Sequence, residues 1–103
     1  MRKINWGIIG LGNIAYEFSK AFAQINNAKL LAISSKDGNK LKKFSQKFNV
    51  EPKFSFKNYQ DLINCDEVDI VYIALPNSFH KQWILKAIEN NKNILVEKPA
   101  TIN

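Results

Sequence analysis

Short apolar runs alternate with amphipathic stretches along this chain. Apolar residues dominate five runs, at residues 4–9, 29–34, 53–56, 68–75 and 93–97. Runs with little polar alternation are typical of parallel strands covered on both faces, so each run predicts a strand. Pro52 directly precedes the third and shortest run, which favours an edge position because proline cannot donate to a strand ladder.

The stretches between these runs place apolar residues at helical spacing. Four helices are therefore predicted: the second is opened by Asp37 and Gly38, the third is capped by Asn58 and the fourth by Ser78. Strands that alternate with helices over short loops predict the α/β class, as a Rossmann-type doubly wound parallel sheet of about five strands in the order 3-2-1-4-5. The apolar stripes of the long helices are Ile14, Phe18, Ala21, Phe22 and Ile25; Leu41, Phe44 and Phe48; and Trp83, Ile84, Ala87 and Ile88.

The first predicted strand runs into a glycine-rich turn, Gly10-Leu11-Gly12-Asn13-Ile14-Ala15. A G-x-G-x-x-A string between a strand and a helix is the fingerprint of dinucleotide binding. Gly10 permits the tight turn, and Gly12 removes a Cβ where a pyrophosphate approaches the N–H groups at the helix start. Ala15 lets the helix lie close to the sheet. The alternative is an ordinary glycine-rich turn without a ligand, since the string alone also occurs by chance.

The carboxyl ends of parallel strands share one edge of a sheet, and ligands bind there near the point where the strand order reverses. Four segments of this chain fall at that edge, namely residues 10–13, 34–36, 75–77 and 97–99. A binding site is therefore expected at the carboxyl ends of the strands.

The residues after the second strand distinguish the two nicotinamide cofactors. A carboxylate there accepts hydrogen bonds from a ribose 2′-hydroxyl and repels a 2′-phosphate. Here the position falls on Ser35, an uncharged donor, and the cation Lys36 follows it. This pair favours a 2′-phosphate and hence NADP. NAD stays an alternative because Asp37 could reach the ribose in a shifted alignment, although the favoured role of Asp37 is the N-cap of the next helix.

Four motifs follow one another along nearly the whole chain: the tract from Gly7 to Ala15, Ser35-Lys36, Pro76-Asn77-Ser78-Phe79-His80, and Glu97-Lys98-Pro99. Together they resemble the N-terminal domain of the Gfo/Idh/MocA oxidoreductases. The start of the chain is similar to the branch that holds dihydrodiol dehydrogenases and D-xylose dehydrogenases. Leu75 departs from the family pattern, in which a small polar residue is common at this position.

The resemblance implies a role for each matching position. Residues of the fingerprint would bind the pyrophosphate, those after the second strand the 2′-phosphate, and those after the fourth and fifth strands would lie on the nicotinamide side of the cofactor. The positions are Gly10, Gly12, Asn13 and Ile14 for the pyrophosphate; Ser35 and Lys36 for the 2′-phosphate; and Leu75, Pro76, Asn77, His80 and Glu97 for the nicotinamide side.

Lys98 is the candidate catalytic residue. Hydride transfer at a carbinol carbon builds or discharges negative charge on the substrate oxygen, and a positioned ammonium can stabilise that charge or pass a proton. Glu97 would orient this ammonium. The alternative is that Lys98 is a solvated loop residue. Its position at a strand end on the binding edge argues against this alternative. His80, the only histidine, has a surface role as its alternative, and no metal site is predicted.

The length of 103 residues predicts a single domain, residues 1–103, that binds NAD(P). Members of the resembled family continue into an α/β substrate domain, for which this length leaves no room. The polypeptide alone is therefore expected to bind nucleotide without turnover, and the full enzyme to act on a sugar, a polyol or a related alcohol or carbonyl compound. A stand-alone, non-catalytic nucleotide-binding or sensor module is the alternative.

The net charge of +6 is concentrated in one region, with seven lysines between residues 36 and 57 against Asp37 and Glu51. Such a field favours a polyanionic ligand, and a solvated helix face is the alternative. No recognition motif accompanies it, so a nucleic acid is not the expected partner. A single cysteine, Cys65, fits a reducing, cytoplasmic location. No membrane segment is predicted, and the exposed sheet edge leaves room for a homo-oligomer.

Overall fold

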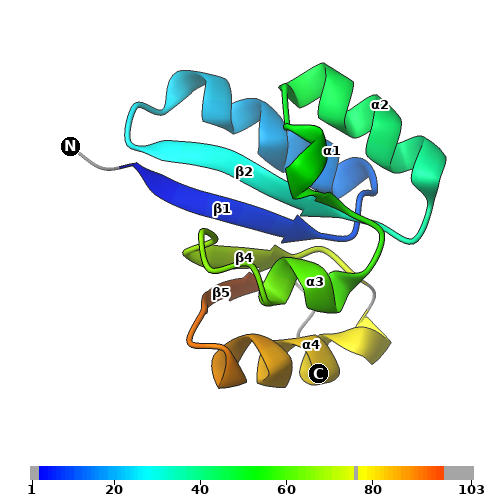
Figure 1. Ribbon diagram of the computed structural model, residues 1–103, viewed down its shortest axis with the longest axis vertical. Helices are drawn as coiled ribbons and strands as arrows, with labels where there is room; N and C mark the ends of the chain where they lie inside the picture. Colours follow the sequence, from blue (N-terminus) through cyan, green and yellow to red (C-terminus); the bar gives the residue numbers. More distant parts are fainter. Residues whose placement is uncertain (1–2, 76, 97–103) are drawn as a thin grey trace.

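A computed structural model of the protein describes residues 3–75 and 77–96, with residues 77–80 and 96 described by their backbone alone. Its centre is a five-stranded sheet in the order β3-β2-β1-β4-β5, in which every neighbouring pair is parallel. The predicted fold class and strand order are thus confirmed (Figure 1). The strands are β1 (Ile4–Ile9), β2 (Ala28–Ser34), β3 (Ser55–Phe56), β4 (Ile70–Ile73) and β5 (Asn93–Val96).

The helices form one layer on each side of this sheet, as Figure 1 shows. One layer consists of α1 (Asn13–Lys20), which continues as the 3-10 turn η1 (Ala21–Gln24), and of α2 (Gly38–Phe48). The other consists of α3 (Tyr59–Ile63) and α4 (Asn77–Glu89). In the described ranges, no helix has the length and apolarity that crossing a bilayer requires.

Large apolar side chains fill the two spaces between sheet and helices. On the α1 side, the ring of Phe18 stacks on Tyr72 of β4 at 4.1 Å, and Trp6 of β1 packs against both Phe18 and Phe22. On the opposite side, Gly7 of β1 makes room for α3. A Cβ on Gly7 would lie 2.9 Å from Leu62 Cδ2. Residues alternate between these two layers along each strand, as expected for a sheet covered on both faces.

Several predicted boundaries are wrong by a few residues. The third run splits: residues 52–54 form the 3-10 turn η2 (Pro52–Phe54), and only Ser55–Phe56 pair with β2. The fourth run begins before β4, because its first apolar residue, Val68, lies in a turn and not in the strand. The N–H of Val68 donates to the Cys65 carbonyl and closes this turn, while the Val68 side chain packs against the sheet and is only 2% exposed. Ser78 lies inside α4, which begins at Asn77, so its predicted capping role is wrong.

Some members of the predicted apolar stripes are not buried. Ile14, Ile25 and Ile88 are 52%, 42% and 54% exposed, although their spacing matches that of buried neighbours such as Ala87. Each lies at or beyond an end of its stripe, where the helix has already turned away from the sheet or the backbone is no longer helical. Helical periodicity therefore predicted the centre of each buried face better than its ends.

Lys92 joins the loop before β5 to the turn before β4. Its Nζ donates to the carbonyl oxygens of Cys65 at 2.7 Å and Val68 at 2.8 Å. Two charge-assisted hydrogen bonds to one ammonium hold the amino ends of β4 and β5 together. This edge of the sheet is opposite the one that carries the predicted binding residues.

Candidate functional site

The turn after β1 is fastened to both neighbouring strands. Gly10 N–H donates to the Ser34 carbonyl of β2 at 3.0 Å, and Ala74 N–H, just after β4, donates to the Ile9 carbonyl at 2.9 Å. Gly10 has a φ of +93°, and a Cβ there would lie 2.9 Å from both the Ala74 carbonyl oxygen and Leu75 Cδ2. The backbone conformation and the close approach of residues 74–75 both require glycine at this position.

Gly12 differs from Gly10 because nothing in the described protein requires it. Its backbone is extended, with φ −103° and ψ −165°, a conformation open to any residue. A Cβ at Gly12 would have no heavy atom within 4 Å. The absent Cβ therefore leaves space outside the protein, which is the space that a pyrophosphate close to the backbone would need.

The start of α1 lies directly beside this space. Gly12 is the N-cap of α1, and within the part of the chain that the structure describes no side-chain hydrogen bond caps this helix start. Asn13 and Ile14 are exposed there. Uncapped N–H groups at a helix start attract anions through hydrogen bonds and through the helix dipole. Gly12, Asn13 and Ile14 thus present a surface that fits a phosphate.

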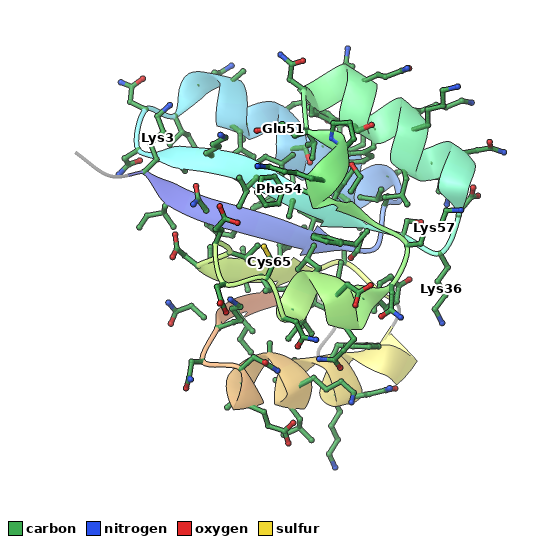
Figure 2. All side chains as sticks on the ribbon, viewed as in Figure 1. Lys3, Lys36, Glu51, Phe54, Lys57 and Cys65 are labelled. Carbon is green, nitrogen blue, oxygen red and sulfur yellow. The ribbon has the colours of Figure 1, made fainter. Side chains whose placement is uncertain are left out.

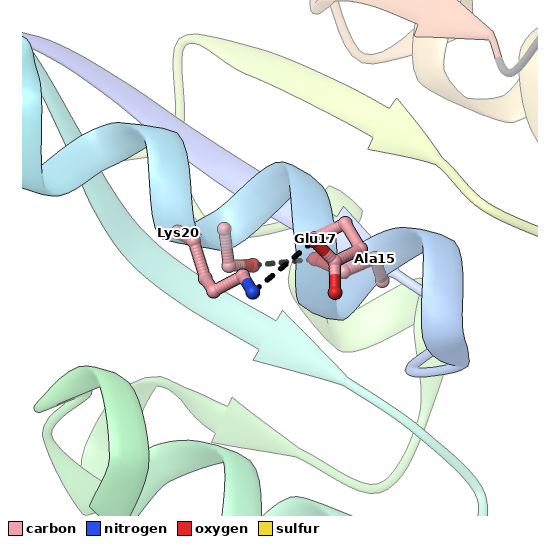
Figure 3. Close-up of polar contacts among 4 residues, drawn as sticks. Ala15, Glu17 and Lys20 are labelled. Carbon is pink, nitrogen blue, oxygen red and sulfur yellow. Dashed lines mark hydrogen bonds and ion pairs between the residues drawn. The ribbon is translucent and has the colours of Figure 1, made fainter.

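α1 itself is held firmly on the sheet. Ala15 is fully buried, as expected for a small residue on the side of the helix that faces the sheet. One turn later, Ser19 Oγ donates to the Ala15 carbonyl at 2.8 Å, and Lys20 pairs with Glu17 at 3.2 Å on the exposed side (Figure 3). The helix start is therefore positioned by packing rather than by a side-chain cap.

The carboxyl end of β2 brings Ser35 and Lys36 to the same edge. Ser35 is buried: its N–H donates to the Phe56 carbonyl, and its Oγ accepts from Asp37 N–H at 3.1 Å. Lys36 is exposed. The Asp37 carboxylate accepts from the N–H groups of Asn39 at 2.9 Å and Lys40 at 3.3 Å, so the favoured N-cap role of Asp37 is confirmed.

The carboxyl end of β3 adds residues that the sequence patterns did not single out for the site. Lys36 Nζ lies 5.5 Å from the ring centroid of Tyr59, the first residue of α3. The Tyr59 ring meets Trp83 of α4 edge-on at 5.3 Å, with planes 86° apart. Burial raises the pKa of the Tyr59 phenol. The only sequence signal was an aromatic residue directly after a cap at the end of a strand.

Lys57 also belongs to this corner of the molecule. A Cβ on Gly38, the first residue of α2, would lie 3.5 Å from Lys57 Cε. Figure 2 shows Lys36 and Lys57 at the same end of the protein, where the chain leaves β2 and β3. Two exposed cations therefore flank the carboxyl end of β2 and make this corner attractive to an anion.

The predicted residues after β4 and β5 are placed only in part. Leu75 is half-buried and packs over Gly10, while Asn77 and His80 lie in the first turns of α4. Pro76, Glu97 and Lys98 lie outside the described residues. The structure thus brings together, at one edge of the sheet, Gly10, Gly12, Asn13, Ile14, Ser35, Lys36 and Leu75.

A hollow of about 770 Å³ lies elsewhere, between the end of α1, the start of β2 and the end of α2. Phe22, Leu30 and Phe48 are among its lining residues. It opens at the amino ends of the strands, so it is separated by the length of the sheet from the fingerprint. The candidate site at the carboxyl edge of the sheet is therefore not this hollow, and it lies at the protein surface.

Comparisons with known proteins identify the family of this chain. The model of the oxidoreductase family with an NAD-binding Rossmann fold, Gfo/Idh/MocA, matches residues 4–103. The chain is 32% identical over 100 residues to a trans-1,2-dihydrobenzene-1,2-diol dehydrogenase of Xenopus tropicalis. The matched region covers 95% of this chain and 30% of that protein. It spans about 30% of the length of the curated relatives that it matches.

Two solved structures share this fold closely. KijD10, a 3-ketoreductase from Actinomadura kijaniata in complex with NADP and TDP-benzene, is 33% identical with a TM-score of 0.88, over 97% of this chain and 30% of that one. A scyllo-inositol dehydrogenase from Lactobacillus casei, with bound NAD(H) and scyllo-inositol, is 30% identical with a TM-score of 0.88, over 99% and 30%. These two neighbours hold different nicotinamide cofactors on the same fold.

Proposed function

Because this chain belongs to the Gfo/Idh/MocA oxidoreductase family, whose Rossmann fold binds NAD(P), we propose that its residues form the nucleotide-binding part of a dehydrogenase. The substrate class would be a sugar, a polyol or a related alcohol or carbonyl compound, in keeping with the inositol and TDP-sugar enzymes among its neighbours and relatives. The observation that carries the proposal is the open space beside Gly12, next to the start of α1, which has no side-chain cap.

The residues present at this edge fit a dinucleotide. Gly12, Asn13 and Ile14 would hold the pyrophosphate through backbone N–H groups, and Gly10 keeps the turn tight enough for that approach. Leu75 would border the nicotinamide side, together with Pro76, Asn77 and His80. The bound nicotinamide supplies or accepts the hydride.

Lys98, with Glu97 orienting it, would act on the substrate oxygen. An ammonium there stabilises an oxyanion or transfers a proton as hydride moves at the neighbouring carbon. In the full-length enzyme, replacing Lys98 by alanine should remove most of the turnover of its sugar or polyol substrate, followed by nicotinamide absorbance, without changing the Kd for the cofactor. A fall in cofactor affinity that matches the fall in rate would assign Lys98 to binding instead.

We further propose a preference for NADP. Ser35 stands where a carboxylate would bind the ribose of NAD, and Lys36 and Lys57 add positive charge at the same corner. The neighbouring carboxylate of Asp37 is directed at the N–H groups of α2. A 2′-phosphate would therefore meet two cations and no ribose-binding carboxylate.

Calorimetric titration of the chain with NADPH and with NADH tests both proposals. Wild type should bind NADPH more tightly, and Lys36→Asp should remove that preference. Lys29→Asp is the matched control, because it makes the same change of charge on an exposed lysine at the amino end of β2. Equal affinities in wild type would refute the NADP preference, and failure to bind either nucleotide would refute the binding function for this chain.

A further inference from the structure

We propose that Tyr59 is a positioning residue for cofactor selection: its ring holds the Lys36 ammonium at the carboxyl end of β2, where a 2′-phosphate is distinguished from a free hydroxyl. This inference rests on the NADP preference proposed above and extends it to a residue on a third strand end. The geometry that carries it is the stack of Lys36 over Tyr59, which is itself held by Trp83.

The distance from Lys36 Nζ to the Tyr59 ring centroid, 5.5 Å, lies within the range of a cation–π contact. An exposed lysine otherwise samples many rotamers, and ordering its four-carbon stem on binding an anion costs entropy. The ring face attracts the ammonium without accepting a conventional hydrogen bond, so the three N–H donors stay available to phosphate oxygens. Tyr59 thus lowers the cost of ordering Lys36 without neutralising it.

Tyr59 can do this because its own position is fixed. The Asn58 side chain caps α3 by accepting from Gln60 N–H at 2.8 Å, which sets the start of the helix on which Tyr59 lies. Trp83 then contacts the ring edge-on, an arrangement that aromatic pairs favour. The contacts of Lys36 with Tyr59 and of Tyr59 with Trp83 therefore connect the loop after β2 to α4.

The neighbouring carboxylate does not compete for Lys36. The Asp37 carboxylate accepts the two N–H groups at the start of α2, and among the described residues Lys36 forms no ion pair. A second lysine–tyrosine stack in the chain provides the contrast. Lys20 lies 5.5 Å from the Tyr16 ring, the same distance, but pairs with Glu17 and lies at the other end of α1. The two stacks therefore differ in the ion pair of the lysine and in their position relative to the candidate site.

The test measures the ratio of the Kd for NADH to the Kd for NADPH by calorimetry. Tyr59→Leu should lower this ratio about two- to fivefold, the change that corresponds to ~0.5–1 kcal/mol for an exposed cation–π contact. Tyr59→Phe keeps the ring face and should keep the ratio. Tyr16→Leu, the matched control, should leave the ratio unchanged. A merely structural role of Tyr59 would weaken both nucleotides alike, and an unchanged or raised ratio in Tyr59→Leu would overturn the inference.

The variant Lys36→Ala distinguishes a failure of this inference from a failure of the proposed NADP preference on which it rests. If Lys36→Ala leaves the ratio unchanged, the assignment of Lys36 fails, and the inference fails with it. If Lys36→Ala lowers the ratio but Tyr59→Leu does not, only the inference fails.

A measurement without nucleotide covers the case in which Tyr59→Leu does not fold. The ring current of Tyr59 should shift the Lys36 ε-proton resonances upfield in the NMR spectra of wild type and Tyr59→Phe. Resonances at their usual positions in the wild type would overturn the inference, because the ammonium would then not rest on the ring.

Discussion

Replacing Gly10 by alanine should destabilise the fold strongly. The φ of +93° is a conformation that costs a residue with a side chain about 1–3 kcal/mol. The new methyl group would lie 2.9 Å from the Ala74 carbonyl oxygen, and crowding of this kind costs about 1–3 kcal/mol more. Restricting the unfolded chain returns only about 0.4–1 kcal/mol. The free energy of unfolding should therefore fall by about 1–6 kcal/mol, with a midpoint of about 3 kcal/mol, against the roughly 5–15 kcal/mol typical of such domains.

Gly12→Ala is the matched comparison, two residues away in the same fingerprint. Its backbone is extended and a Cβ meets nothing, so the loss of a good N-cap residue, about 1 kcal/mol, is offset by a similar gain from the unfolded chain. Its stability should stay within about 1 kcal/mol of wild type, while its affinity for NADPH should fall about tenfold or more because the methyl group occupies the space of the phosphate.

Thermal unfolding followed by circular dichroism measures both variants. Gly10→Ala should lower Tm by roughly 12–24 °C at the midpoint of its range, whereas Gly12→Ala should change Tm by no more than about 8 °C in either direction. Calorimetric titration then compares their affinities for NADPH. Equal losses of Tm in the two variants would refute the claim that Gly10 is required for the stability of the fold whereas Gly12 is required for binding of the cofactor.

Three further predictions concern the supports of the site. Asp37→Ala should lower the free energy of unfolding by about 1 kcal/mol, measured by urea titration, because two N–H groups of α2 lose their acceptor. Lys92→Met should cost about 1.5–3 kcal/mol in the same titration and speed amide exchange near Cys65 and Val68, whose carbonyls lose a charged donor. Burial raises the pKa of Tyr59 above the usual range of a tyrosine phenol, so deprotonation favours the unfolded state. Stability should therefore fall as the pH rises above about 10, and it should fall less in Tyr59→Phe.

The strand order could be predicted because its signals are local. Each central strand is a nearly continuous apolar run, and two of the connections carry a recognisable helix cap, Asp37 before α2 and Asn58 before α3. What could not be predicted were boundaries that depend on partners distant in the sequence. The last residues of the third run form a strand only where β2 lies beside them. The Val68 side chain is buried because it packs beside Gly7, although Val68 itself is not part of a strand. Periodicity carries no information about such partners.

The candidate site was predictable to the extent that it follows strand ends. Gly10, Gly12 and Ser35 lie where the fingerprint and the strand order place them. The contact between Lys36 and Tyr59 was not foreseen, because the two residues belong to different crossovers and meet only when β3 lies beside β2. The roles of Pro76, Asn77, His80, Glu97 and Lys98 stay predictions.

The two tryptophans of the chain occupy opposite layers of the fold. Trp6 lies between β1 and the aromatic rings of α1 and η1, whereas Trp83 lies on α4 against α3. A variant with Trp6→Phe or Trp83→Phe keeps a single fluorophore, and its emission then reports on one layer only. The protein therefore contains a separate optical probe for each half of its core, with which one can time whether the two layers lose their packing together or in sequence.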